Sequence, residues 1–487
     1  MRPATSSLAT LSRLVRPTHA SACVGWSAHA EGVDRLLASF AAVPAEQQVR
    51  LAKRTSNLFR ERSRARGPGL DTSGLTGVVE VDPATRTAEV QGMCTYETLV
   101  DATLAHGLLP LVVPQLKTIT LGGAVTGLGI ESTSFRHGLP HESVLSMDVL
   151  TGTGEVVTAR PDGSPDEQAL WRGLPNSYGS LGYAVRLRIE LEEVPPFVAL
   201  RSVRLDDLDA VQDTLARVAE TGAHDGERVD AVDAVVFAAD ECYVVLARWS
   251  DEPGPTSDYT GRQVYYRSLQ HPSGTTHDRL TIRDYVWRWD TDWFWCSRAF
   301  GAQDPRVRRL WPRRWLRSSV YWRLVALDRR FAVADRLERR AGRPPRERVV
   351  QDVEVEVGRT ADFLRWFVAE VPVEPVWLCP LRLRESSDAP GADRPWPLYP
   401  LRPGRTYVNI GFWSTVPATP GDPSACNRAV EQAVGRMGGH KSLYSEAFYD
   451  EATFAALYGG DHAHRLKTRF DPGSRFPTLY DKAVRRR

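Results

Sequence analysis

The chain has 487 residues, of which 42% are hydrophobic and 25% charged, a composition typical of a soluble globular protein with two or three domains. Its formal net charge is only +2, so the overall charge gives no basis for binding nucleic acid. The sequence contains no run of about 18 uninterrupted apolar residues, which argues against a transmembrane helix.

The six cysteines lie far apart, with no CxxC motif and no histidine at a spacing typical of metal ligands. This pattern predicts free thiols in a reducing compartment, and therefore a cytoplasmic protein without disulfides or a structural metal. The cysteines are Cys23, Cys94, Cys242, Cys296, Cys379 and Cys426.

The first 25 residues are rich in Ser, Thr, Ala and Arg and lack acidic residues, as transit peptides do. They also lack the apolar stretch of a signal peptide. We therefore interpret residues 1–45 as a partly disordered N-terminal extension, and a targeting segment remains the alternative. Further along, Gly77–Asp82 and Thr87–Gly92 read as strands, and Thr95–Gly107 reads as a helix with Leu99 and Leu104 facing a core.

Between Pro114 and Val144, glycines alternate with short apolar stretches rather than forming a random linker. Glycine lacks a Cβ atom, so its N–H group can approach a ligand closely. Hydroxyl side chains in the same run can donate hydrogen bonds to carbonyl or phosphate oxygens. The pattern indicates backbone wrapped around a flat cofactor. Its glycines are Gly122, Gly123, Gly127 and Gly129, and its hydroxyl residues include Thr118, Thr120, Thr126, Ser132, Thr133 and Ser134.

Two further patterns follow. Met147–Ala159 has two apolar runs around Gly-Thr-Gly, which predicts a β-hairpin. A second glycine pair, Gly179 and Gly182, precedes a strand with alternating apolar residues from Val185 to Leu191.

These ordered motifs resemble the FAD-binding domain of the vanillyl-alcohol oxidase / p-cresol methylhydroxylase (PCMH) superfamily, and within it the delta-24 sterol reductase (Diminuto-like) group. The resemblance covers most of the chain, from about Leu51 to Lys482. It rests on five motifs: TLGGAVTGLGIES (Thr120–Ser132), HGL (His137–Leu139), GSLG (Gly179–Gly182), PVWLCP (Pro375–Pro380) and FPTLYDK (Phe476–Lys482).

The resemblance implies an α+β fold: a two-subdomain PCMH-type FAD-binding domain over residues 46–195 and an α+β substrate (cap) domain over residues 196–440. Residues 441–487 would return to the FAD domain. Pro195 and Pro196 mark the boundary between the two domains. Period-two alternation in Val353–Val357 and Tyr407–Trp413 independently predicts an antiparallel sheet in the cap, with helices on one face. The other expected cap strands are 234–240 and 243–249, and the expected helices are 361–371 and 427–437.

The same resemblance implies the FAD contacts. An early loop at Ser56, Asn57 and Leu58 would hold the pyrophosphate, although the glycine-rich form of that loop is missing, and a helix N-cap by Thr55 or Ser56 is the alternative. No histidine or cysteine stands out for covalent attachment, so we expect non-covalent FAD. The remaining expected contacts are Pro114, Thr118, Leu121, Gly122, Gly123, Thr126, Gly127, Gly129, Ile130, Ser132, His137, Gly138, Gly179, Gly182 and Tyr183.

Residues 287–322 contain seven of the fourteen tryptophans, interleaved with arginines. This composition suits the interface of an anionic bilayer, where aromatic rings lie at headgroup depth. The alternative is a cavity wall whose arginines pair with local acids. Either interpretation favours a lipid-like substrate and leaves base stacking with nucleic acid improbable. Peripheral contact with the inner face of the membrane therefore remains an expectation for a cytoplasmic protein.

The family resemblance implies reduction of an isolated carbon–carbon double bond with NADPH as transient electron donor. An unconjugated alkene needs a proton before or together with hydride, so an acid is needed near the flavin. Glu131, inside the glycine-rich motif, is the first candidate, and a structural carboxylate is its alternative role. Tyr444, Tyr449 and Tyr480 are further candidates, each with a core role as the alternative.

The substrate is expected to be a lipid, either a sterol side chain or a methylene-branched fatty acyl chain. For the acyl chain, a methyltransferase partner would install the methylene group first. The alternatives are an FAD-dependent alcohol oxidase or dehydrogenase, and a non-catalytic lipid-binding protein. The absence of a GxGxxG motif after a strand indicates that NADPH has no separate site.

Overall fold

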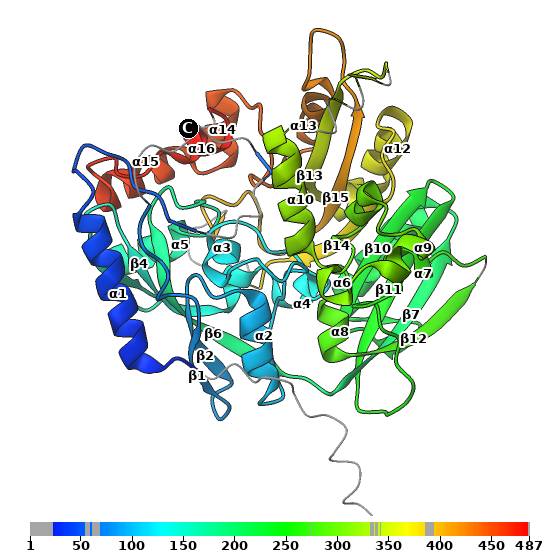
Figure 1. Ribbon diagram of the computed structural model, residues 1–487, viewed down its shortest axis with the longest axis horizontal. Coiled ribbons are helices and arrows are strands. Elements are labelled where there is room, and N and C mark those ends of the chain that lie inside the picture. Colours follow the sequence, from blue (N-terminus) through cyan, green and yellow to red (C-terminus); the bar gives the residue numbers. More distant parts are fainter. Residues whose placement is uncertain are drawn as a thin grey trace, which may run out of the picture.

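The computed structural model describes residues 23–53, 59–60, 69–272, 274–331, 336, 339–340, 342–384 and 394–485. Two lobes, each built around an antiparallel sheet, lie side by side (Figure 1). The predicted phosphate residues Ser56, Asn57 and Leu58 lie outside the described residues, as do the first 22 residues.

The first lobe contains a six-stranded sheet. Its order is β1-β2-β6-β4-β5, and β3 pairs with another part of β6. The predicted hairpin is confirmed, because β4 and β5 pair antiparallel from Met147↔Ala159 to Leu150↔Val156. The strands are β1 Val78–Asp82, β2 Thr87–Gln91, β3 Leu108–Pro110, β4 Val144–Leu150, β5 Val156–Ala159 and β6 Tyr183–Glu193.

Short, well-capped helices surround this sheet. Thr95 and Thr120 each accept a backbone N–H at the start of α2 and α3, which explains where these helices begin. Helix α1 packs Leu36 and Phe40 into a core cluster, so part of the predicted N-terminal extension belongs to the folded lobe. The helices are α1 Gly25–Ala41, α2 Tyr96–Leu104, α3 Leu121–Thr126, α4 Ser134–His137 and α5 Pro165–Gly173, with a 3-10 turn η2 at Pro140–Ser143.

The second lobe contains an eight-stranded antiparallel sheet in the order β12-β7-β11-β10-β14-β15-β13-β16. Helices α6 (Leu208–Thr221), α12 (Thr360–Glu370) and α13 (Ala425–Arg436) pack on one face and bury a shared apolar cluster. The predicted antiparallel sheet with helices on one face is confirmed, as are its expected strands and both expected helices. The strands are β7 Phe197–Leu205, β10 Ala231–Ala238, β11 Glu241–Ser250, β12 Thr275–Thr281, β13 Arg346–Glu356, β14 Val376–Arg382, β15 Thr406–Pro417 and β16 His440–Lys441, beside a small hairpin of β8 Ala223–His224 and β9 Glu227–Arg228.

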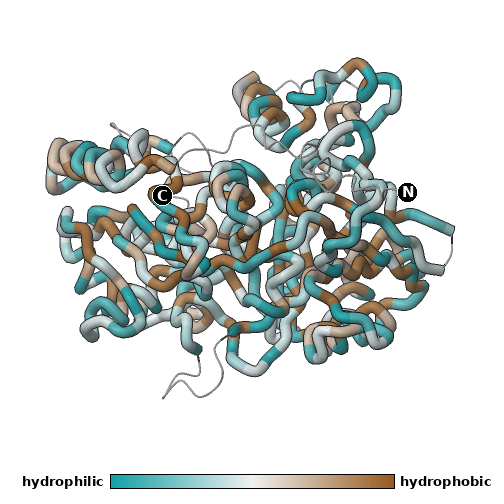
Figure 2. Tube along the Cα trace, turned by 90° about the horizontal axis from the view of Figure 1, so that it is seen from below, coloured by the Kyte–Doolittle hydropathy of each residue, from teal (hydrophilic) through white to brown (hydrophobic). Residues whose placement is uncertain are grey.

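A long connection between β11 and β13 contributes to a core cluster that also includes residues of the first lobe. Figure 2 shows hydrophobic segments running through the interior of both lobes. Among the described residues, no helix is both long enough and apolar enough to cross a bilayer. The helices of this connection are α7 Tyr265–Ser268, α8 Ile282–Val286, η3 Cys296–Phe300, α9 Pro305–Leu310, η4 Arg313–Trp315 and α10 Ser318–Phe331, and η5 (Val357–Arg359) follows β13.

The C-terminal segment crosses back to the first lobe, where its helices lie above α5 and α3 (Figure 1). Lys467 and Lys482 donate hydrogen bonds to the carbonyl oxygens of Ser180 and Gly179, at 2.8 and 2.6 Å. The segment consists of α14 Glu451–Leu457, α15 Gly460–Phe470 and α16 Leu479–Ala483.

Candidate active site

Two glycine-bearing loops of the first lobe meet beside helix α3. The amide of Tyr178 donates to the carbonyl of Thr126 at 2.7 Å, joining the 176–182 loop to the end of α3. A Cβ atom on Gly127 would lie 3.2 Å from the Tyr178 ring. A Cβ atom on Gly122 would lie 2.6 Å from the carbonyl oxygen of Gly92, so glycine is needed there for backbone packing. Gly122 therefore shapes the loop from inside the protein.

Gly123 faces a different environment. Its nearest neighbours are the hydroxyl of Thr120 and the ammonium of Lys53, and these two groups are hydrogen-bonded at 2.9 Å. Lys53 directly precedes the segment that holds Ser56, Asn57 and Leu58. A cation, a helix start and a glycine thus lie together, a combination suited to an anionic ligand such as a pyrophosphate.

Several buried polar atoms around these loops have no hydrogen-bond partner among the described residues: Gln115 Nε2, Ser177 Oγ and Tyr178 OH. Buried polar groups are normally satisfied, so orphaned atoms of this kind fit a polar ligand. The donor set and the glycine-lined backbone are compatible with FAD.

The structure does not bring all the expected contacts to this place. His137 lies against Glu192 at 3.4 Å, and Gly138 ends α4 with a positive φ of 68°. Tyr183 packs edge-on against Phe476, and Gly182 lies against the backbone of Leu150. Each of these four residues thus has close neighbours within the protein, and their contact with FAD stays a prediction.

The other expected contacts form the body of the loop. Leu121 and Ile130 are buried, and Thr126 donates to the carbonyl of Gly122 at 2.7 Å. A Cβ atom on Gly129 would lie 2.9 Å from the Pro114 ring, so these residues pack together. Among the other predicted residues, Thr118 is half-buried, Ser132 is buried and Gly179 has a positive φ of 73° in the second loop.

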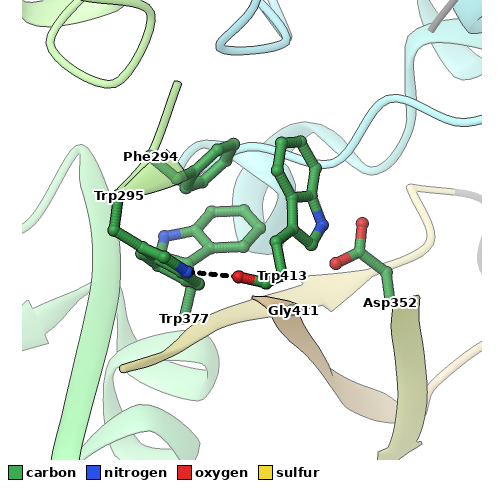
Figure 3. Close-up of a pocket in the computed structure, with 6 residues that line it drawn as sticks. All are labelled: Phe294, Trp295, Asp352, Trp377, Gly411 and Trp413. Atoms are coloured by element: carbon green, nitrogen blue, oxygen red, sulfur yellow. Dashed lines mark hydrogen bonds between the residues drawn. The ribbon is translucent and has the colours of Figure 1, made fainter. Parts of the chain in front are cut away.

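A small cavity of about 10 Å³, which is room for a single water molecule, lies in the cap between β13–β15 and the β11–β13 connection. Aromatic rings form most of its wall, and Asp352 supplies a carboxyl group at one side (Figure 3). Trp295 Nε1 donates to the carbonyl of Trp413 at 2.7 Å, which ties the connection to the sheet. The lining residues are Phe294, Trp295, Asp352, Trp377, Gly411 and Trp413.

Asp352 reaches this pocket because β13 and β15 pair it directly with Gly411. A side chain at position 411 would collide with the Asp352 carboxylate, so the glycine makes room for it. Burial raises the pKa of Asp352 to about 7, and the nearby Tyr444 and Asn409 side chains oppose that rise. An acid that is about half protonated near neutral pH thus faces aromatic rings.

Glu131 is buried in a different arrangement. Its Oε1 atom accepts from Ser132 Oγ at 2.7 Å and from Arg288 Nη2 at 3.1 Å. Arg288 also donates to Asp233 at 3.0 Å, so two carboxyl groups share one arginine. Burial raises the pKa of Glu131, Arg288 lowers it and Asp233 raises it. The Oε2 atom of Glu131 is buried without a partner among the described residues.

The three candidate tyrosines are separated. Tyr444 lies beside the pocket, where its hydroxyl accepts from Trp413 Nε1 at 3.0 Å. Tyr449 and Tyr480 instead pack with Phe454 in a small C-terminal cluster, and the Tyr480 hydroxyl donates to the Tyr449 carbonyl at 3.3 Å. Only Tyr444 of the three contacts a residue that lines the pocket.

The tryptophan-arginine stretch divides into two parts. Trp287, Trp289, Trp293 and Trp295 are buried, and Arg288 is held by acids. Here the cavity-wall interpretation describes the structure, and peripheral membrane contact through residues 287–322 stays a prediction. Beyond residue 304 several large side chains are exposed.

Sequence reasoning missed Asp352, Asp233 and Arg288. The only signal was the placement of acids on alternate positions of a predicted strand, as in Asp352 and Glu354, whose intervening residue Val353 is fully buried. A strand covered on both faces makes such acids buried, and burial is what perturbs their pKa values.

Comparison with known proteins identifies the first lobe. Residues 31–160 match the model of a family described as "FAD binding domain". The chain contains an FAD-binding domain. The match begins before residue 46, consistent with α1 packing onto this lobe.

Most of the chain is also distantly similar to Delta(24)-sterol reductases. The human protein is 24% identical over 84% of this chain and 76% of its own length, and the Arabidopsis thaliana protein is 24% identical over 87% and 78%. Cytokinin dehydrogenase 6 of Oryza sativa is 41% identical over a shorter region, 23% of this chain and 20% of its own length. The chain is therefore an FAD-dependent oxidoreductase distantly related to the sterol reductases.

Proposed function

We propose that this protein reduces an isolated carbon–carbon double bond in a lipid, with FAD as cofactor and NADPH as electron donor. The observation that carries the proposal is Asp352, an acid with a raised pKa in the wall of an aromatic pocket. The relationship to the Delta(24)-sterol reductases supports the reaction class.

The chemistry requires a proton donor and stabilisation of positive charge. Asp352 would donate its proton to the less substituted alkene carbon, which leaves developing positive charge on the more substituted carbon. The faces of Trp377, Trp413 and Phe294 can stabilise that charge through cation–π interactions and exclude water. A bound flavin would supply the hydride that completes the reduction. Asp352 would then regain a proton from solvent.

Several residues of the first lobe would hold FAD. Lys53 and Gly123 would face its phosphates, and Gln115, Ser177 and Tyr178 would satisfy its polar groups. Lys482 and Lys467 hold the 176–182 loop in place through hydrogen bonds to the carbonyl oxygens of Gly179 and Ser180.

Glu131 remains a second candidate for the proton donor, but we assign that role to Asp352. Glu131 is engaged by Arg288 and Ser132 through Oε1, whereas Asp352 lines the pocket and its pKa is governed by burial and by neutral neighbours. Glu131 is then a positioning residue that orients Arg288 behind the glycine-rich loop.

The substrate would be a lipid alkene with a branched carbon, either in a sterol side chain or in a methylene-branched acyl chain. The cavity is far smaller than the roughly 300–1,000 Å³ of typical ligand sites, so the surrounding aromatic side chains would have to move apart to admit even the reacting part of the molecule. A methyltransferase acting on an unsaturated acyl chain is the class of enzyme that would supply the second substrate.

Purified protein tests this proposal under anaerobic conditions. We expect NADPH to bleach the flavin absorbance, and addition of one of the two lipid alkenes to restore it. In deuterated water the product should gain one deuterium at the less substituted carbon. Flavin that is reduced by an alcohol but not by NADPH would favour an oxidase or dehydrogenase, and protein without flavin would favour a lipid-binding role.

A further inference from the structure

Residues 305–315, which comprise α9 and η4, form an exposed ridge on the β11–β13 connection. Leu310 is 85% exposed and Trp315 is 48% exposed, and Val307 between α9 arginines is also exposed. Single exposed apolar side chains are common, but three within so short a segment indicate a contact surface.

The charge of this ridge has one sign. From residue 305 to residue 327 the sequence contains arginines but no acid. Arg308, Arg313 and Arg317 pair with Asp292, Asp258 and Glu97 of neighbouring segments. The remaining three ridge arginines, Arg306, Arg309 and Arg314, are exposed beside Leu310 and Trp315.

We propose that the 305–315 ridge docks on the surface of an anionic lipid bilayer. Exposed arginines would meet lipid phosphates, while Leu310 and Trp315 would enter the headgroup region, the usual depth of interfacial aromatic side chains. Charge complementarity selects a membrane of net negative charge.

An aromatic chain connects the region behind the ridge with the pocket. Trp311 of the ridge lies 6.4 Å from Tyr321 of α10, measured between ring centroids. Trp322 then packs against Phe59 and Trp293, at 4.9 and 5.2 Å. Trp293 in turn lies 6.1 Å from Trp413, which lines the pocket. If the substrate is a lipid, as proposed above, docking would place this packed aromatic segment, which extends to the pocket wall, near the source of the substrate.

Co-sedimentation of the full-length, flavin-loaded protein with vesicles tests the docking directly. We expect binding to vesicles of phosphatidylcholine with phosphatidylglycerol, weak binding to phosphatidylcholine alone, and loss of binding at 1 M salt, where the Debye length is about 3 Å. The triple variant R306Q/R309Q/R314Q should weaken binding by about 100-fold, since each arginine near an anionic surface contributes about fivefold. The double variant L310S/W315S should also weaken it at low salt.

A matched control removes the same charge elsewhere. Arg217, Arg359 and Arg436 lie on the helical layer of the cap, and R217Q/R359Q/R436Q should leave vesicle binding unchanged. Equal losses in the two triple variants, or equal binding to neutral and anionic vesicles, would overturn the proposal. The wild type could also fail to bind vesicles and self-associate instead. If Leu310→Ser abolished that self-association, the ridge would be an interface between two copies of this protein rather than a bilayer-docking surface. Vesicle binding needs no turnover, so its outcome is independent of the test of catalysis.

Discussion

At the residue scale, the buried Glu131 and the half-buried Asp352 differ in which neighbours stabilise their charged forms. Burial raises the pKa of both carboxyl groups. The cation Arg288 opposes that rise in Glu131, whereas only neutral groups, Tyr444 and Asn409, oppose it in Asp352. An acid without a cationic partner holds its proton at higher pH. This difference makes Asp352 the better proton donor and predicts distinct behaviour for the two residues.

Replacing Asp352 with Asn should lower alkene reduction by about 10²–10⁴-fold, the usual cost of losing general acid catalysis, while NADPH still reduces the flavin. Wild-type turnover should fall as the pH rises above about 7, because the protonated form is the reactive one. Stopped-flow absorbance separates the two half-reactions. Glu356→Gln, a change at the exposed end of the same strand, is the control.

Asp352→Asn should lower activity, yet it should raise the free energy of unfolding at high pH. The folded-state pKa of Asp352 is raised above its ordinary value, so this group's stabilising contribution is present at low pH and is lost as the pH rises toward 7. Asp352→Asn should therefore be more stable than wild type toward urea at pH 8 and lack this part of the pH dependence. An activity loss accompanied by unfolding at pH 8 would contradict our assignment.

Arg288 provides the second prediction. Replacing it with Met leaves Glu131 and Asp233 buried together without a cation, which should cost about 3–5 kcal/mol in the free energy of unfolding. The triple variant R288M/E131Q/D233N should recover much of that loss, because no uncompensated charge remains. Urea titrations measure both effects.

Glu131→Gln alone separates positioning from catalysis. It leaves Arg288 paired with Asp233, so we expect folded, flavin-loaded protein whose flavin is still reduced by NADPH. Substantial alkene reduction by this variant would agree with Asp352 as the donor. Loss of deuterium transfer in Glu131→Gln, with normal transfer in Asp352→Asn, would reverse the assignment.

At the scale of single elements, the sequence predicted what local periodicity determines. The hairpin β4–β5 and the strands β13 and β15 follow from alternating apolar residues and from turn residues. The glycine-rich loop was also recognisable, because glycines occupy positions where backbones meet closely, as Gly122 does with Gly92.

The site depends on information that periodicity does not contain. Asp352 reaches the pocket through the pairing register of β13 with β15, and Arg288 meets Asp233 and Glu131 across long sequence separations. His137 and Tyr183 lay within the expected motifs but turn toward Glu192 and Phe476. Motif position therefore identified the loop but did not determine the direction of each side chain.

Helix α3 gives a further prediction, because its two glycines face different surroundings. Gly122→Val should disrupt packing against the Gly92 backbone and reduce both stability and flavin content. Gly123→Val should mainly reduce flavin content, because its side chain would face Thr120 and Lys53.

Gly435→Ala in α13 is the control. A Cβ atom there meets nothing within 4 Å, and the change should stabilise the protein by about 0.4–1 kcal/mol. Flavin absorbance and thermal unfolding distinguish the three variants, and full flavin occupancy in Gly123→Val would exclude that residue from the cofactor site.

At the scale of the whole molecule, the C-terminal segment links the ends of the chain to the candidate cofactor site. Lys482 is half-buried and donates to the carbonyls of Tyr178 and Gly179, at 3.1 and 2.6 Å. Arg60 also lies over the Tyr178 ring at 5.0 Å. Arg60 near the start of the chain and Lys482 near its end thus both contact the 176–182 loop.

Replacing Lys482 with Met keeps the length of the side chain but removes both hydrogen bonds to that loop. We expect flavin affinity to fall about tenfold, since two such bonds contribute on the order of 1–3 kcal/mol, while the cap keeps its fold.

Burial lowers the pKa of Lys482 to about 7, so wild-type stability should rise as the pH increases from 7 toward the ordinary lysine value, and the variant should lack that rise. Flavin titration of the apoprotein and urea unfolding at pH 7 and 9 measure the two effects. Arg485→Met, which removes ion pairs with Asp481 and Glu451 and a cation–π contact with Tyr480 but no hydrogen bond to the loop, is the control. Unchanged flavin affinity in Lys482→Met would show that the C-terminal segment covers the first lobe without shaping its cofactor loop.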